Sequence, residues 1–194
     1  DDDNVNFTAD LGFVEGVALG NTIWYDSGAS ANDGVFDGDE SGVNGVDVQL
    51  FRDANGNNLP DPGADTLVRS TTTNASGQYV FDQLDPGPYF VYIPASEFGS
   101  GQPLYRYVSS RDTTAKDETT DESGDENGLD DADPVTNGIS TQVYALQPNS
   151  EQTGEPQPNY SGTLDDDNVN FTADLGFVEG VAIGNTIWYD TGAS

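Results

Sequence analysis

Residues 53–65 carry oxygen-bearing groups at alternating positions, and the segment reads DANGNNLPDPGAD. A calcium ion takes about six to eight oxygen ligands, and an EF-hand loop supplies them from alternate positions of a tight turn. Counted from position 1, the candidate ligands are Asp53, Asn55, Asn57, the main-chain carbonyl of Leu59, Asp61 and the terminal acid Asp65. The spacing predicts a calcium site. A solvated turn rich in Asp and Asn is the alternative.

Two departures from the EF-hand pattern affect this loop. Asn58 occupies the sixth position, where glycine is usual. Asparagine enters the left-handed backbone region more readily than most residues, so the turn remains possible. Asp65 comes one residue later than the terminal acid of an EF-hand, so we expect a slightly longer loop.

Residues 26–40 form a second acidic segment, which reads DSGASANDGVFDGDE. If Glu40 is the terminal acid, the first and third ligand positions fall on Ala29 and Ala31, whose side chains cannot ligate. Asp26 can replace them only if residues 27–29 loop out. The candidate ligands are Asp26, Asp33, the main-chain carbonyl of Val35, Asp37 and Glu40. An acidic turn without metal is the alternative.

Residues 121–133 form a third acidic segment, DESGDENGLDDAD. Several registers of a calcium loop fit it equally well, and an acidic run can also be simply solvated. The candidate ligands are Asp121, Ser123, Asp125, Asn127 and Asp131. With the other two segments, this one leads us to expect about two to three Ca²⁺ ions per repeat.

The charge balance excludes several classes of partner. The chain has 35 acidic residues, only 5 basic ones and a net charge of -30. Binding to nucleic acid or to an anionic membrane surface needs a basic surface, so we expect neither partner. Such self-repulsion costs stability unless cations neutralise it. Either bound calcium or high salt around a halophilic acidic surface could do so.

The residue types that are missing narrow the chemistry further. Cys and His are both absent, which excludes disulfides, zinc sites, imidazole bases and thiol nucleophiles. A glycosidase using two carboxylates stays conceivable in so acidic a chain. No acidic pair lies in an apolar or Arg-supported setting that the sequence reveals, so we do not expect an enzyme. No apolar run is long enough to insert into a membrane in this window.

A segment of 30 residues occurs at both ends of the chain, at residues 1–30 and 165–194. The copies differ only where Leu19 becomes Ile183 and Ser27 becomes Thr191, and their offset is 164 residues throughout. This is the signature of a tandem array. We expect one full period plus an overlap of a longer repetitive polypeptide, which favours a mechanical or spacing role over catalysis.

Alternation of apolar and polar residues dominates the chain and predicts short β-strands. The expected strands are 20–26, 46–50, 66–73, 77–84, 88–93, 104–108, 139–146 and 168–177. The segments 77–84 and 88–93 flank Asp85-Pro86-Gly87, which indicates a hairpin. Short strands separated by turns predict an all-β sandwich with long acidic loops.

Three stretches together resemble a known family: GNTIWYD, GVFDGDESGVNGVDVQLFRDANGN and TLVRSTTTNASGQYVFDQLDPGPYFVYIPAS. They are similar to the SdrD B-like repeat, a relative of the Cna B-type domain. The resemblance implies a calcium-binding, prealbumin-like antiparallel β-sandwich, arrayed in tandem on bacterial surface proteins. It carries the calcium role onto Asp26, Asp33, Asp37 and Glu40. Some Cna B relatives contain a Lys-Asn isopeptide bond; Lys116, the only lysine, lies in the acidic loop, so we expect none.

The resemblance also suggests the module boundaries. Residues 1–15 would be the last strand of the preceding repeat, 16–178 one complete repeat module, and 179–194 the first strand of the next. The joint is short and apolar, so we expect adjacent copies of the repeat to touch in line.

The leading interpretation is a calcium-stiffened repeat unit of an extracellular stalk or filament, on the cell surface or secreted. One alternative is an adhesin module that binds an unknown ligand through exposed tyrosines. The candidate tyrosines are Tyr89, Tyr92, Tyr105 and Tyr107. A second alternative is a halophilic acidic surface domain without specific calcium sites.

Overall fold

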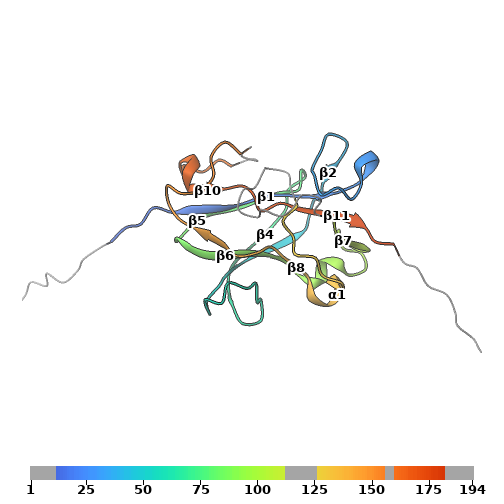
Figure 1. The fold of residues 1–194 in the computed structure, drawn as a ribbon, viewed down its shortest axis with the longest axis horizontal. Coiled ribbons are helices and arrows are strands. Elements are labelled where there is room, and N and C mark those ends of the chain that lie inside the picture. The colour runs from blue at the N-terminus through green and yellow to red at the C-terminus, as the bar shows by residue number, and fades with distance from the viewer. Residues whose placement is uncertain (1–11, 112–125, 156–159, 182–194) are drawn as a thin grey trace, which may run out of the picture.

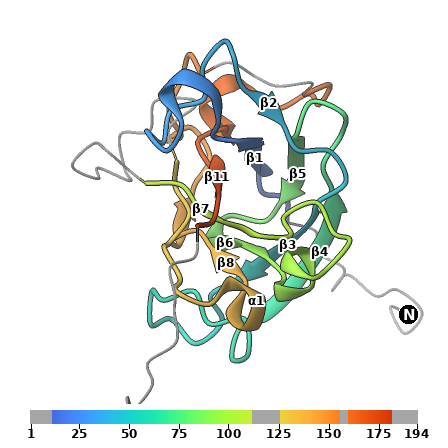
Figure 2. The same cartoon turned by 90° about the vertical axis from the view of Figure 1, so that its right-hand side faces the viewer.

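The computed structural model of the protein describes residues 12–111, 126–155 and 160–181. They form a sandwich of two β-sheets (Figure 1 and Figure 2). The first sheet contains β1 (Val17–Tyr25), β2 (Ser41–Gly42), β5 (Gln78–Leu84), β7 (Tyr107–Ser109), β10 (Val169–Asn170) and β11 (Leu175–Glu179). The second contains β3 (Asp47–Arg52), β4 (Thr66–Thr72), β6 (Gly87–Ile93), β8 (Ile139–Ser140) and β9 (Tyr144–Leu146).

Helices are short in the described part of the chain. The 3-10 helices are η1 (Gly28–Ser30), η2 (Ala95–Phe98) and η3 (Asp166–Asn168), and the α-helix is α1 (Pro134–Asn137). None of the helices found there has the length and apolar character needed to cross a membrane. The all-β class expected from the alternating pattern is confirmed.

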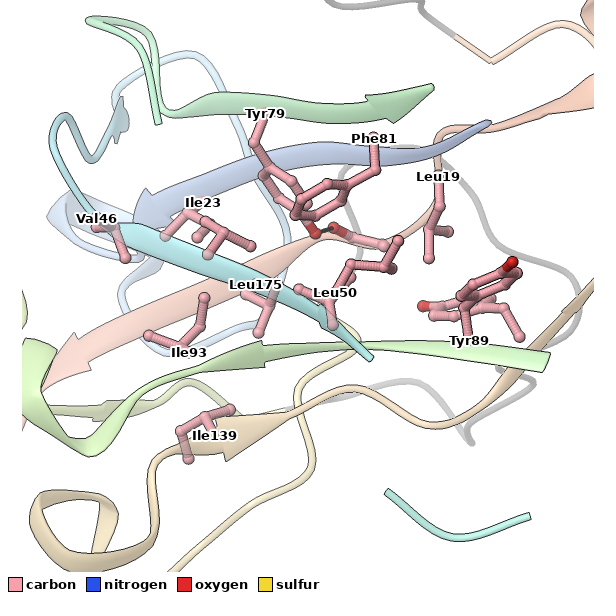
Figure 3. Packing of buried hydrophobic residues seen from close by; sticks show 14 of the residues in the cluster. Leu19, Ile23, Val46, Leu50, Tyr79, Phe81, Tyr89, Ile93, Ile139 and Leu175 are labelled. Carbon is pink, nitrogen blue, oxygen red and sulfur yellow. Dashed lines mark hydrogen bonds between the residues drawn. The ribbon is translucent and has the colours of Figure 1, made fainter. Parts of the chain in front are cut away.

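The core lies between the two sheets (Figure 3). Leu19, Ile23 and Phe81 of the first sheet face Leu50 and Ile93 of the second, and all five are fully buried. Their spacing explains the burial, because every second residue of a strand points to the same face. Figure 2 shows the two layers, with β1, β5 and β11 in one and β3, β4, β6 and β8 in the other.

The predicted antiparallel sandwich is confirmed for most of the described strand pairs, but the first sheet is mixed, so the prediction is wrong for two of its pairs. β1 runs parallel to β10, with Ala18 opposite Val169, and parallel to β11, with Tyr25 opposite Phe177. Parallel strands need a long connection between them. Here nearly the whole module is that connection, and the last strand returns to lie beside the first.

The predicted hairpin around Asp85-Pro86-Gly87 is also wrong. β5 pairs with β1, whereas β6 pairs with β3, so the turn carries the chain from one sheet to the other. The hairpin on this side of the sandwich is instead β3–β4, whose register pairs Arg52 with Thr66. Its connection is the acidic segment 53–65.

A buried polar cluster holds the parallel strands together. Asn21 of β1 donates from Nδ2 to the carboxylate of Asp174 at 2.7 Å and to the carbonyl of Phe171 at 2.6 Å. The main-chain N–H of Thr22 donates to the same carboxylate at 3.0 Å. Asp174 is 1% exposed, and buried charges require such partners. We call these groups the β1 clasp, because they fix the last strands against the first.

The direction of β1 and β11 gives the module two poles. The N-terminal pole is the end where β1 begins, and the C-terminal pole is the end where β11 finishes. Figure 1 shows the first and last described residues at opposite ends of the long axis. The duplicated segments differ in environment, since Phe177 is fully buried and its copy Phe13 is 94% exposed. The module boundaries stay a prediction that fits these values.

Candidate functional site

The loop 53–65 is organised around the carboxylate of Asp53, which follows β3 directly. Asp53 is 6% exposed and accepts hydrogen bonds from the main-chain N–H groups of Gly56 at 2.7 Å and Asn58 at 2.9 Å. Asn58 has φ 58°, which is the left-handed conformation that an EF-hand turn requires at its sixth position. Asparagine therefore replaces glycine here as the sequence suggested.

The remaining side chains of this loop hold it closed through hydrogen bonds. Asp65 accepts from the N–H groups of Ala54 at 3.0 Å and Asp61 at 3.1 Å, which ties the two ends of the loop together. Asn57 accepts from the N–H of Leu59 at 2.8 Å and donates to Asp61 at 2.7 Å. The predicted residues thus lie in one compact turn.

The oxygen atoms that segment 53–65 offers as calcium ligands are of mixed types. Among the described residues, three or more acidic side chains nowhere gather in a way that could hold a metal by themselves. Calcium also accepts amide and main-chain carbonyl oxygens as ligands. The segment 53–65 offers Asn55, Asn57 and the Leu59 carbonyl in addition to its three carboxylates, so its residues fit calcium by type. Their role as ligands stays a prediction.

The segment 26–40 is organised by Asp26, which is 1% exposed at the end of β1. Its carboxylate accepts from the N–H groups of Asn32 and Gly34, the latter at 2.9 Å. Helix η1 occupies the chain between these positions. Asp33 accepts from the N–H of Val35 at 3.1 Å, which places both predicted residues in the same turn.

The charges of Asp26 and Asp37 act on Glu40, and Asp37 and Asp39 interact with each other. Glu40 accepts from the N–H groups of Ser27 at 2.8 Å and Asp37 at 3.2 Å. Burial is the main cause that raises the pKa of Glu40, and the charges of Asp26 and Asp37 raise it further. The hydrogen bond between the Asp37 and Asp39 carboxyl groups raises the pKa of Asp37 and lowers that of Asp39. A bound cation would relieve the repulsion that Asp26 and Asp37 exert on Glu40.

The third predicted segment is described only in part. Asp121, Ser123 and Asp125 lie outside the described residues. Asn127 is buried and its Oδ1 accepts from the N–H of Asp174 at 3.1 Å, so it extends the β1 clasp. Asp131 accepts from the N–H of Asp133 at 2.6 Å and from the Asn137 amide at 3.0 Å. Their role as ligands stays a prediction, with both side chains engaged in these contacts.

Sequence reasoning missed an acidic group near the N-terminal pole. Glu155 is 7% exposed, and its Oε2 has no hydrogen-bond partner in the described structure. Burial is the main cause that raises its pKa, followed by the charges of Asp166 and Glu151. Residues 147–167 read only as a loop rich in Pro, Gly and Ser. Only contacts across 16 residues, such as Phe171 N–H to Glu155, reveal the group.

Glu97 provides a pH test of the buried carboxyl groups. It is 4% exposed, and burial raises its pKa, with a further rise from the charge of Asp47. A carboxyl group whose pKa is raised on folding contributes fully to folding stability below the pKa that it has in the unfolded chain. This contribution is lost as the pH rises through the folded-state pKa. We therefore predict that the melting temperature of Glu97→Gln rises relative to that of the wild type as the pH increases from about 4 to 7.

The measurement is thermal unfolding followed by circular dichroism across this pH range in chelator. Glu155→Gln is expected to behave in the same way, because burial also raises the pKa of Glu155. Asp85→Asn is the control at an exposed position. Parallel profiles for Glu97→Gln and the wild type would contradict the prediction.

The chain is similar to known proteins over most of the module. The family described as the SdrD B-like domain matches residues 17–155. Serine-aspartate repeat-containing protein I of Staphylococcus saprophyticus is 40% identical over 94 residues, which are 47% of this chain and 4% of that protein. The fibrinogen-binding protein of Staphylococcus epidermidis is 38% identical over 90 residues, which are 45% of this chain and 7% of that protein.

Two solved pilins have weaker similarity. The full-length major pilin SpaD of Corynebacterium diphtheriae matches with a TM-score of 0.39 and 16% identity, over 88% of this chain and 34% of that chain. The shaft pilin SpaA of Lactobacillus rhamnosus GG matches with a TM-score of 0.38 and 10% identity, over 86% and 51%. The family match covers well over half of the chain. This protein therefore belongs to the SdrD B-like domain family.

Proposed function

We propose that this protein is a calcium-stiffened structural unit of an extracellular stalk or filament. The observation that carries the proposal is the path of the chain through the module. β1 begins at one pole, and β11, parallel to β1, finishes at the other. Successive copies joined through these strands would extend in line, because the described residues 12–16 and 180–181 flank the module at opposite poles.

The strand register sets the length that each copy adds. Phe177 lies level with Tyr25, so Gly180 lies level with a point three residues beyond Tyr25 along the strand direction. Measured from Gly16, this is twelve residues of extended chain, or about 40 Å at the usual rise of a strand. A period of 164 residues therefore extends the stalk by about 40 Å.

The loop 53–65 is the calcium site that we propose with most support. Asp53 and Asp65 would provide carboxylates at its two ends, and Asn55, Asn57, Asp61 and the Leu59 carbonyl would complete the ligands. Bound calcium would supply positive charge among these oxygens and link the ends of β3 and β4. The segment 26–40 would provide a second site, whose ligands would be Asp26, Asp33, Asp37, Glu40 and the Val35 carbonyl.

An extracellular location follows from the resemblance to repeats of bacterial surface proteins. The chain spans less than a tenth of the curated relatives quoted above, so the activity of the whole protein is part of this proposal. Binding fibrinogen is named only for the Staphylococcus epidermidis relative. All four candidate adhesive tyrosines have contacts within the module. Tyr89 bonds the Asp85 carbonyl, Tyr92 bonds the Asn137 carbonyl and Tyr107 packs on Tyr25, while the guanidinium of Arg106 lies over the Tyr105 ring at 5.3 Å.

The experiment that tests the proposal compares arrays of one, two and four periods by electron microscopy and solution scattering. In calcium, we expect the length to rise by about 40 Å per period and the particles to stay straight. After chelation at constant ionic strength, the arrays should bend more. Compact particles whose length does not grow with period number would contradict the stalk. Equal stiffness in both conditions would contradict the role of calcium.

A further inference from the structure

A groove of about 480 Å³ lies at the C-terminal pole beside the end of β11. The residues that line it include Val108, Arg111, Asp130, Val178, Glu179 and Val181. Val181 is 99% exposed. Val181 lies two residues beyond the end of β11. A β-branched side chain that is exposed this fully lacks the packing that strand residues normally have. Its copy one period earlier, Val17, is fully buried and pairs with Leu84.

The repeat indicates what covers this groove. Glu179 and Val181 correspond to Glu15 and Val17 one period earlier, because the offset is 164 residues. At the N-terminal pole, Asn149 donates from Nδ2 to Glu15 Oε2 at 2.8 Å. Glu15 precedes β1 and, with the predicted module boundaries, belongs to the last strand of the preceding copy. The contact at the N-terminal pole is therefore already a contact between two periods.

We propose that the groove is the docking seat for the next copy of the repeat, whose Asn149 binds Glu179. The inference rests on the proposed in-line stalk and names its joint. The loop that carries Asn149 is held rigidly, since the N–H groups of Ser150 and Glu151 both donate to the Asp167 carbonyl at 3.0 Å. A fixed loop can present Asn149 to the preceding copy without a large loss of conformational entropy.

The alternation of side chains along residues 177–181 directs the cores of the two copies to the same face of the strand. Leu175 and Phe177 point into the core, and Val17 and Leu19 point into the core of the module that they begin. Alternate residues share a face, so Val181 continues the face of Phe177 when Gly180 is extended. The φ of Gly180 lies outside the left-handed region, and its N–H donates to the Arg106 carbonyl at 2.7 Å.

Charge also favours a second copy as the occupant. Arg111 lines the groove and Arg106 lies beside it, and these are two of the five basic residues of the chain. Within the described residues, the ion pair that forms is Arg69–Asp82, and it involves neither Arg106 nor Arg111. The loop of the next copy would bring Glu151 to this pole together with Asn149; its carboxylate also accepts from the N–H of Gln147 at 2.7 Å and from Asn170 Nδ2 at 3.1 Å within its own copy. Such complementary charges fix orientation more than they add affinity.

The absence of cysteine allows a direct test in a chain of two consecutive periods. Glu179→Cys is placed in the first copy and Asn149→Cys in the second, and a short bis-maleimide is added. We expect an intrachain crosslink, detected by mass spectrometry. The matched control carries both substitutions in the first copy, where the two positions lie at opposite poles, so no crosslink should form.

A second variant inserts one glycine after Gly180, which shifts the alternation by one residue and turns the next copy to the other face. We expect the crosslink yield to fall by about tenfold, while circular dichroism shows that both modules stay folded. Equal yields with and without the insertion, or no crosslink in the uninserted chain, would overturn the docking seat. A chain that still lengthens by about 40 Å per period without crosslinking would keep the stalk and reject only the joint.

Discussion

Removal of calcium is expected to lower the melting temperature by about 5–10 °C for each site that empties. A ligand at about 100 times its dissociation constant adds about 2.7 kcal/mol to folding stability, and each 1 kcal/mol shifts the melting temperature of a domain of this size by about 2–4 °C. The expected effect is large because Asp53 and Asp26 are buried, and because the charges of Asp26 and Asp37 act on Glu40 when no cation is bound. Binding energy is folding energy where the unfolded chain has no site.

Calorimetric scans in excess calcium, in chelator and in sodium of equal ionic strength would measure this effect. Asp53→Asn should reduce the melting-temperature difference between calcium and chelator, which separates a lost ligand from general destabilisation. Asp85→Asn is the matched control, because Asp85 is exposed on a turn outside the predicted loops. If the scans in calcium and chelator coincide, the calcium sites are wrong and the halophilic surface becomes the better interpretation.

Phe177→Ala is expected to destabilise the module by about 3–5 kcal/mol, the usual cost of removing a buried phenylalanine side chain. Phe177 is fully buried and packs edge-on against Phe98, with ring centroids 5.8 Å apart. Its copy Phe13 has the same local sequence and is 94% exposed. Phe13→Ala should therefore change stability by less than about 0.5 kcal/mol.

Urea unfolding of the two variants would measure both values under one condition. Phe177→Leu provides a milder variant that stays folded if alanine abolishes the native state. The pair tests which copy of the duplicated segment belongs to the described module. Equal destabilisation at both positions would show that residues 1–15 also pack on a sandwich, for instance one of another chain.

The alternating pattern located most strands, because it reports which residues face the core. Residues 168–177 looked like one strand, yet they form β10 and β11 with a break between them. The break occurs because Asp174 turns inward to bind Asn21. A short-range pattern cannot reveal this contact, since the two residues are 153 positions apart.

Strand partners were harder to predict than strand positions. Both sides of Asp85-Pro86-Gly87 have the composition of a hairpin, but β5 and β6 each find a better-matched neighbour elsewhere. The same limit hid the parallel pairing of β1 with β11. A period-two pattern identifies the buried face of a strand and does not say which other strand lies beside it.

In the candidate site, too, contacts between residues close in sequence could be predicted and contacts between distant residues could not. The loop 53–65 could be recognised because its hydrogen bonds, such as Asn58 N–H to Asp53, join residues close in sequence. Asn127 also lies at a plausible ligand spacing, but its side chain binds Asp174, 47 residues away. The spacing of acidic residues predicts a loop well when the hydrogen bonds that close the loop join residues within it.

The parallel arrangement of β1 and β11 determines how the module would carry mechanical load. Tension along the chain pulls β1 out through one pole and β11 out through the other, so the two adjacent strands are sheared past each other. The ladder at Ile23, Trp24 and Tyr25 must then break together with the Asn21–Asp174 bond, rather than one bond at a time. Loading of this kind spreads the force over many hydrogen bonds at once. The return of the last strand to the first thus gives each copy resistance to stretching along the axis in which the copies follow one another.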